Sequence, residues 1–345
     1  MCTIINLFLH TRIMSAGNNF RQFFQFTARS DPKWYPGHMR KSLKQLQSLL
    51  SITDCILEIH DARIPLSGRN VEFKRTLSGV RPHILVLNKS DLSSHKKEDK
   101  VNLVKHLKSQ DPNLSDVIFT SFRDSSIKFI LPKALETIHN FPRFQRGGGP
   151  EKNILVIGIP NVGKSSIINH LRKVRLNFSG DATRVGALPG VTRALQTKIK
   201  VNQDPLTYLW DSPGIVFPSL NDSHVALKLA VCKRIRDDLI GEEIVADYLL
   251  FHLNKQAVFK YVKVLGLSAP TDDIQSLPLQ VALRFNWNKN VKNLVTNQIE
   301  MIPNKHQASL HFLKLFRMGK LGRVNLDALD LHNQENAPKR TIVSI

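Results

Sequence analysis

Short apolar runs alternate with stretches of helical periodicity through the first two thirds of this sequence. Six runs have the length and apolar character of buried strands: Ile56–Ile59, His83–Leu87, Val117–Phe119, Ile154–Ile157, Leu195–Val201 and Leu206–Trp210. Helical periodicity is found in three stretches, Leu43–Leu50, Ile127–His139 and Ser165–Leu171. Strands that alternate with helices are typical of a doubly wound α/β sheet, which binds its ligands at the carboxyl ends of the strands. We therefore expect a functional site at that edge.

The pattern changes beyond about residue 221, where the strand signal fades. Four stretches there predict helices: Val225–Ile235, Ile244–Leu253, Val281–Phe285 and Ala308–Phe316. A glycine-rich joint at residues 146–150 is typical of a surface linker. A length of 345 residues suffices for two domains. We expect an α/β domain over residues 31–220, a smaller helical domain over 221–330 and a flexible tail over 331–345.

The net charge of the chain indicates what kind of partner it binds. An apolar content of 42% is that of a folded chain, whereas 49 lysines and arginines against 28 acidic residues give a net charge of +21. Such an excess indicates a polyanionic partner, either RNA or an anionic membrane surface. Residues 143–200 alone hold eleven basic and two acidic side chains. We expect contacts with RNA phosphates, with a solvated basic face as the alternative, from Arg172, Lys173, Arg175, Arg184 and Arg193.

Residues 1–30 differ from the rest of the chain because they contain three arginines and no acidic residue. Phe20, Phe23 and Phe24 have helical spacing within them. The segment is similar to a mitochondrial transit peptide, with a basic tail that holds RNA as the alternative, and we expect cleavage near Ala28–Asp31. No run approaches the roughly 18 consecutive apolar residues of a membrane-spanning helix. The three cysteines are too scattered for a disulfide framework or a zinc site.

The strongest chemical signal is the octapeptide GIPNVGKS, from Gly158 to Ser165, between a predicted strand and a predicted helix. In such a phosphate-binding loop the glycines allow backbone N–H groups to surround the phosphates. Lys164 then reaches the β and γ oxygens, and the Ser165 hydroxyl binds Mg²⁺. The residues expected to bind the nucleotide here are Gly158, Asn161, Val162, Gly163, Lys164, Ser165 and Ser166.

A second motif selects the base. Asn88, Lys89, Ser90 and Asp91 directly follow a predicted strand. The carboxylate of Asp91 accepts hydrogen bonds from N1–H and the amino group of guanine, whereas adenine presents a lone pair at N1 and is repelled. The sequence therefore predicts a site for GTP and GDP.

Three further segments complete the expected site. Thr120 and Ser121, at another strand end, fit the element that meets guanine O6, with an ordinary serine turn as the alternative. Asp211 begins an Asp-Ser-Pro-Gly motif, in which it holds Mg²⁺ through water and the N–H of Gly214 contacts the γ-phosphate. Thr192 lies between this motif and the P-loop, where a mobile segment brings its hydroxyl to the metal. The predicted metal-binding residues are Ser165, Thr192 and Asp211.

The order of these elements along the chain is unusual. In an ordinary GTPase the P-loop precedes the guanine-reading segment, but here Asn88 precedes Gly158 by seventy residues. We therefore expect a circularly permuted P-loop GTPase domain. Such a permutation is possible where the original termini lie close together at the surface, and the glycine-rich joint can bridge them. The permutation places the end of the Asp-Ser-Pro-Gly segment directly before the helical domain.

With the permuted elements, Trp34–Met39, Asp61–Pro65 and Phe316–Arg323 resemble the YlqF-type circularly permuted GTPases over about residues 31–325. Given the transit-like leader, the mitochondrial ribosome-associated members of that family are the most similar. The resemblance implies a GTPase of the mitochondrial matrix that acts in late assembly of the large ribosomal subunit, with a helical domain that contacts rRNA. We expect neither DNA nor an obligate second copy as a partner, and only peripheral contact with the inner membrane.

The residue that positions the attacking water is left open. Ile215 follows Gly214, where Ras-like enzymes place a glutamine that orients this water. The resemblance points to His38 instead, with a purely structural histidine as the alternative. Asn161 occupies the P-loop position used by potassium-activated GTPases, so K⁺ is a second candidate. Two other functions stay open: a nucleotide-gated RNA-binding module with negligible hydrolysis, and a signalling GTPase at a membrane surface.

Overall fold

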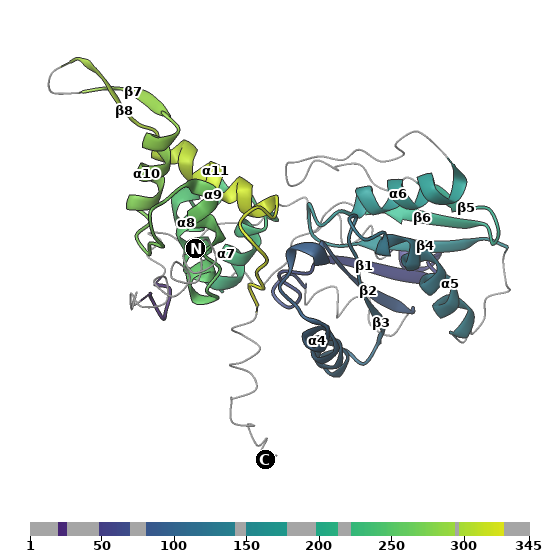
Figure 1. Ribbon diagram of the computed structural model, residues 1–345. Helices are drawn as coiled ribbons and strands as arrows, with labels where there is room; N and C mark the ends of the chain where they lie inside the picture. Colours follow the sequence, from purple (N-terminus) through teal and green to yellow (C-terminus); the bar gives the residue numbers. More distant parts are fainter. Residues whose placement is uncertain are drawn as a thin grey trace, which may run out of the picture.

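The computed structural model describes residues 20–25, 48–69, 81–141, 150–177, 198–212, 222–293 and 297–327. Two bodies lie side by side in this part of the chain (Figure 1). We call the described residues from Ser48 to Ser212 the sheet body and those from Asp222 to Asp327 the helical body.

The sheet body is built on six strands in the order β3-β2-β1-β4-β6-β5. They are β1 (Cys55–Asp61), β2 (His83–Asn88), β3 (Leu114–Phe119), β4 (Lys152–Ile157), β5 (Lys198–Asn202) and β6 (Thr207–Asp211). Neighbouring strands are parallel, except that β5 is antiparallel to β6. The predicted strands are confirmed in the described part of the chain. The clearest signals belong to β1 and β2, because parallel strands buried on both faces form continuous apolar runs.

Helices cover both faces of this sheet. On one face, Leu57 and Ile59 belong to a core that includes α5 (Ile130–Asn140) and α6 (Lys164–Leu176). On the other face, α4 (Lys97–Gln110) buries Leu103 and Leu107 against β2 and β3. Each buried aliphatic side chain contributes about 1.5–3 kcal/mol, so these cores fix the strand ends that carry the polar motifs. The sequence pattern does not predict α4, because these two leucines are its only buried residues.

The helical body begins with α7 (Ser223–Val231), and four more α-helices follow it in the described residues. They are α8 (Glu242–Lys255), α9 (Lys260–Leu265), α10 (Ser276–Arg284) and α11 (Lys305–Arg317). Helix α8 packs against α7 and α11. The predicted helix at 225–235 ends earlier, at Val231, and a turn follows in which Lys233 has a φ of +58°. Helix α10 begins before its predicted range.

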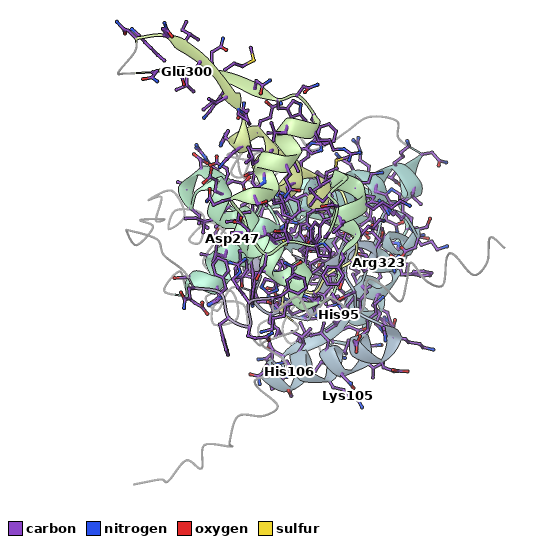
Figure 2. All side chains as sticks on the ribbon, turned by 60° about the vertical axis from the view of Figure 1, so that its left-hand side comes forward. His95, Lys105, His106, Asp247, Glu300 and Arg323 are labelled. Carbon is purple, nitrogen blue, oxygen red and sulfur yellow. The ribbon has the colours of Figure 1, made fainter. Side chains whose placement is uncertain are left out.

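The domain expected to be helical also contains two strands, which the sequence pattern does not predict. Strands β7 (Asn288–Lys292) and β8 (Ile299–Pro303) form an antiparallel hairpin that projects from the helices (Figure 1). Figure 2 labels Glu300 on this hairpin, away from the helices. All five side chains of β7 are exposed, so the apolar alternation that reveals a half-buried strand is missing from the sequence.

Short 3-10 turns join the longer elements: η1 (Ser90–Leu92), η2 (Ser126–Phe129) and η3 (Asp237–Leu239). Of the predicted helix at 43–50, the described residues 48–50 are helical. No helix in the described part of the chain is long and apolar enough to cross a membrane.

Candidate functional site

The loop between β4 and α6 approaches its neighbours so closely that it requires its glycines. Gly158 and Gly163 have φ values of +147° and +104°. A Cβ on Gly158 would lie 2.3 Å from the carbonyl oxygen of Ile59, and one on Gly163 would lie 2.5 Å from Nδ2 of Asn88. Gly163 is also the N-cap of α6. The loop therefore leads into a helix N-terminus, where backbone N–H groups and the helix dipole favour an anion.

Lys164 begins α6, followed by Ser165 and Ser166, and folds back over the loop. Its Nζ donates hydrogen bonds of 3.1 Å to the carbonyl oxygens of Gly158 and Ile159. Burial lowers the pKa of Lys164 to about 8, although the nearby Asp211 carboxylate raises it. A buried ammonium group that donates to two carbonyl oxygens in the described part of the chain is well suited to bind a phosphate.

The guanine-reading segment contacts this loop across the sheet edge. The Asn88 side-chain Nδ2 donates a 2.8 Å hydrogen bond to the carbonyl oxygen of Val162. Lys89 Nζ donates one of 3.1 Å to the carbonyl oxygen of Asn161. Two motifs separated by more than seventy residues are thus brought together as predicted.

Asp91 is oriented by the other predicted base-binding element. The Ser121 hydroxyl donates a 2.8 Å hydrogen bond to Asp91 Oδ1, and Ser90 N–H donates to the carbonyl oxygen of Thr120 at 3.0 Å. Arg123 Nε lies 3.2 Å from Asp91 Oδ2. The Ser121 contact leaves the Asp91 carboxylate in one orientation, which is what recognition of a base edge requires.

Two of the three residues expected to bind the metal lie together in the described part of the chain. Ser165 Oγ donates a 3.0 Å hydrogen bond to Asp211 Oδ2. Burial raises the pKa of the Asp211 carboxyl group, and its Oδ1 is buried with no hydrogen-bond partner among the described residues. A hydroxyl oxygen beside a carboxylate with an unpaired oxygen fits Mg²⁺, which prefers oxygen ligands. Thr192, Gly214 and His38 lie outside the described residues, so their roles stay predictions.

Comparisons with known proteins agree with this geometry. A family model described as "50S ribosome-binding GTPase" matches residues 153–269. Mitochondrial GTPase 1 of Aedes aegypti is 43% identical, over 90% of this chain and 98% of its own length. Mitochondrial ribosome-associated GTPase 1 of Xenopus tropicalis is 44% identical, over 89% of this chain and 98% of its own. The chain belongs to the mitochondrial GTPase 1 family.

The fold of this mitochondrial GTPase 1 family member is a circularly permuted P-loop GTPase, because β2 with the guanine-reading segment precedes β4 with the P-loop. The chain is therefore a GTPase. Among solved structures, GNP-bound YlqF from T. maritima is similar, with 22% identity and a TM-score of 0.49, over 83% of this chain and 97% of that one.

Sequence reasoning missed a buried charge cluster behind the P-loop of this GTPase. Asp61 accepts hydrogen bonds from Arg63, whose Nε and NH2 lie at 2.9 and 2.8 Å, and from NH2 of Arg234. Arg234 also donates from NH1 to the carbonyl oxygen of Pro160 at 3.4 Å. Burial by itself raises the pKa of Asp61, but the charges of Arg63 and Arg234 hold it well below its usual range. Asp61 and Arg63 stood in a family motif without a role, and nothing in the sequence marks Arg234.

The helical body touches the P-loop at a second point. Asn161 Nδ2 donates a 2.9 Å hydrogen bond to the carbonyl oxygen of Lys233, in the turn after α7. The residue expected to bind K⁺ thus also joins the two bodies of this GTPase. Its K⁺ role is untested by this contact and stays a prediction.

The predicted RNA-contacting residues are only partly within the described chain. Lys173 and Arg175 are exposed near the end of α6, and Arg172 is half-buried. Arg184 and Arg193 lie outside the described residues. Lys320 and Arg323, the latter labelled in Figure 2, are exposed on a turn after α11.

Proposed function

We propose that this chain hydrolyses GTP during late assembly of the large ribosomal subunit of mitochondria, and thereby supports mitochondrial translation. The observation that carries this proposal is the direct contact between P-loop and helical body, made by Asn161 with Lys233 and by Arg234 with Pro160. A change of the P-loop on GTP hydrolysis acts on the helical body through these contacts. The names of the relatives, which describe ribosome association, support the ribosome as the partner.

Each described residue of the site has a distinct task in this proposal. Lys164 and the N–H groups at the start of α6 bind the phosphates, and Asp91, oriented by Ser121, binds guanine. Ser165 and Asp211 hold Mg²⁺ with Thr192. When bound, the metal ion neutralises charge on the β- and γ-phosphate oxygens. Three sources of catalysis remain for test: His38, K⁺ at Asn161, or a group supplied by the ribosome.

The expected partner is rRNA, because exposed basic side chains lie on both bodies. Lys173 and Arg175 lie on the P-loop helix α6, and Lys320 and Arg323 lie beyond α11. We place the GTPase domain at residues 31–220 and the helical domain at 221–330. The proposed location is the mitochondrial matrix, where net positive charge allows peripheral contact with anionic lipid of the inner membrane.

One alternative is a nucleotide-gated RNA-binding module with negligible hydrolysis, which Ile215 favours because isoleucine cannot orient water. GTP turnover with and without purified mitochondrial large subunits, in potassium and in sodium buffer, decides between the two. The assembly GTPase predicts turnover that rises with subunit concentration. Subunit binding that depends on GTP without any rise in turnover supports the module. If the subunits neither bind the protein nor stimulate its GTP turnover, the ribosome is not the partner.

A further inference from the structure

Residues Phe20–Gln25, which we call the strap, lie against the helical body rather than the sheet body (Figure 1). They fall within the leader expected at residues 1–30. The spacing of their phenylalanines is that of a helix, but these six residues form no helix in the structure. Their contacts are instead those of a docked peptide without regular secondary structure, which bends at Gln22 and Phe23.

The polar half of the docking site consists of two carboxylates that hold Arg21. Its NH1 and NH2 donate hydrogen bonds of 3.1 and 2.7 Å to the two oxygens of Asp247 on α8, which Figure 2 labels. Its backbone N–H donates one of 2.7 Å to Asp272, whose carboxylate also lies 3.2 Å from Nε. Lys255 Nζ adds a 2.7 Å hydrogen bond to the carbonyl oxygen of Gln22. The bidentate geometry at Asp247 selects an arginine over a lysine.

The apolar half of the docking site consists of the aromatic rings of Tyr248, Phe251 and Phe259, which we call the floor. Phe24 is only 9% exposed and belongs to the main hydrophobic core. Its ring centroid lies 4.9 Å from that of Tyr248, edge to face, and 5.8 Å from that of Phe251. Phe20 lies 5.6 Å from Phe259. The adjacent Phe23 is 83% exposed, so burial is specific to Phe24.

We infer that the strap is a built-in ligand of the helical body and that processing of any leader ends before Phe20. The helical body thus contains a receptor for a Phe-Arg-x-x-Phe peptide. Cleavage near Ala28–Asp31 would turn the strap into a free short peptide. The contacts of two rings, one arginine and one backbone carbonyl do not offset the lost translational freedom of such a peptide. Its release would expose the floor and leave Asp247 and Asp272 without these partners. Cleavage near Ala28–Asp31, as expected from the sequence, is therefore the alternative outcome of the experiment below.

The position of processing rests on the proposed mitochondrial function, and is tested by mapping the first residue of the protein recovered from mitochondria with mass spectrometry of its terminal peptide. We expect a start at or before Phe20. A start beyond Phe20 would overturn the inference. A protein absent from mitochondria contradicts the proposed location, and the docking is then judged on the purified chain alone.

Docking is tested on the full chain with Phe24→Ala and the matched control Phe23→Ala. Loss of the buried ring should lower the melting temperature by roughly 5 °C, whereas the control should melt within about 1 °C of the natural protein. Brief trypsin treatment should cut after Arg21 in Phe24→Ala and spare that bond in the control. GTP affinity should stay unchanged in both. Equal melting and equal cleavage of the two variants would overturn the inference.

If Phe24→Ala fails to fold, Arg21→Lys provides the second variant. It keeps the charge but cannot pair with both oxygens of Asp247. We expect faster trypsin cleavage at position 21 at an unchanged overall fold. Cleavage as slow as in the natural protein would show that the bidentate pair does not hold the strap.

Discussion

The side-chain amide of Asn88 donates a hydrogen bond to the carbonyl oxygen of Val162, and the two residues are 74 positions apart. Asn88 ends β2 and Val162 follows β4, while β1 lies between these strands in the sheet. The hydrogen bond therefore crosses the sheet edge and joins the segment predicted to bind guanine to the loop predicted to bind the phosphates. It depends on the order of strands in the sheet and not on their order along the chain, which is why a permuted GTPase can retain it.

This contact predicts that Asn88→Ala weakens GTP binding although Asn88 need not touch the nucleotide. The change leaves the buried carbonyl of Val162 without its donor, at a cost of about 1–3 kcal/mol, and loosens the P-loop. We expect roughly tenfold weaker binding in a titration with fluorescent GTP. Asn202→Ala is the matched control, because the Asn202 amide also donates to backbone carbonyls, near β5. Its GTP affinity should stay that of the natural protein, and an equal loss in both variants would contradict a local role of Asn88.

Asp91→Asn should exchange the base preference from guanine to xanthine. An amide in place of the carboxylate donates to the C2 oxygen of xanthine, and it no longer accepts two hydrogen bonds from guanine. Loss of hydrogen bonds to a charged group costs about 1.5–3 kcal/mol, or roughly ten- to a hundredfold in GTP affinity. Competition between GTP and xanthosine triphosphate measures the change. Asp116→Asn, on β3, removes a carboxylate elsewhere and should keep the preference for GTP. Unaltered preference in Asp91→Asn would mean that another group reads the base.

The lowered pKa of Lys164 predicts that its amine takes up a proton when GTP binds above about pH 8. Burial lowers its pKa to about 8 in the protein without nucleotide, so the amine is increasingly neutral as the pH rises beyond that value. Phosphate oxygens restore the charged form, and affinity therefore falls with rising pH. Calorimetry in two buffers of different ionisation enthalpy measures the uptake at pH 7 and pH 9.

The control for this experiment is Lys173→Ala, which removes an exposed lysine of the same helix and should retain the uptake. Burial also lowers the pKa of Lys89, to about 7. Lys89 differs from Lys164 because its Nζ donates to the carbonyl oxygen of Asn161. Equal heats in the two buffers at pH 9 would show that Lys164 is already charged before GTP arrives.

The strands and the P-loop were predictable because each has a local signal. A strand buried on both faces is a continuous apolar run, and the polar motifs follow directly where β2, β4 and β6 end. Helix α4 and the β7–β8 hairpin lack such a signal, since the first buries two residues and the exposed face of the second carries no alternation.

Long-range charge pairs were not predictable for a different reason. Arg234 contacts Asp61 across 173 positions, and Arg21 contacts Asp247 across 226. Among 49 basic residues, a single arginine carries no local sign of its partner. The acid-free composition around Arg21 gives no sign of its pairs, because the acidic partners lie far along the chain. Composition within a short window cannot contain that information.

His252 predicts a specific loss of stability in acid. It is buried beside Tyr248 and Phe251, and neither ring nitrogen has a hydrogen-bond partner in the described part of the chain. Burial, with the charge of Lys228, lowers its pKa to about 3. Between the ordinary histidine pKa and this value, only the unfolded chain binds the proton, so the free energy of unfolding decreases as the pH falls. The slope from this residue is up to about 1.4 kcal/mol per pH unit.

His252→Phe should remove this dependence while it keeps an aromatic ring in the same place. Urea unfolding at pH 7 and pH 5 measures the difference. The exposed His306, in the first turn of α11, provides the control, because His306→Phe should retain the pH dependence of the natural protein. If His252→Phe loses as much stability in acid as the control does, protonation of another group is responsible.

The last prediction concerns the source of catalysis, for which Ile215 is unsuited. If His38 positions the attacking water, His38→Ala should leave GTP affinity nearly unchanged. It should then lower ribosome-stimulated turnover by roughly ten- to a hundredfold, or about 1.4–2.7 kcal/mol of barrier. Single-turnover hydrolysis with saturating mitochondrial large subunits, in potassium and in sodium, measures this step. Full stimulation of His38→Ala combined with its loss in sodium assigns catalysis to the cation and leaves His38 structural. Asn161→Ala tests the K⁺ site from the protein side. Its GTP affinity is measured in parallel, because the Asn161 amide also donates a hydrogen bond to the carbonyl oxygen of Lys233. If His38→Ala and sodium are both harmless, the ribosome must supply the group, as an arginine finger in trans does.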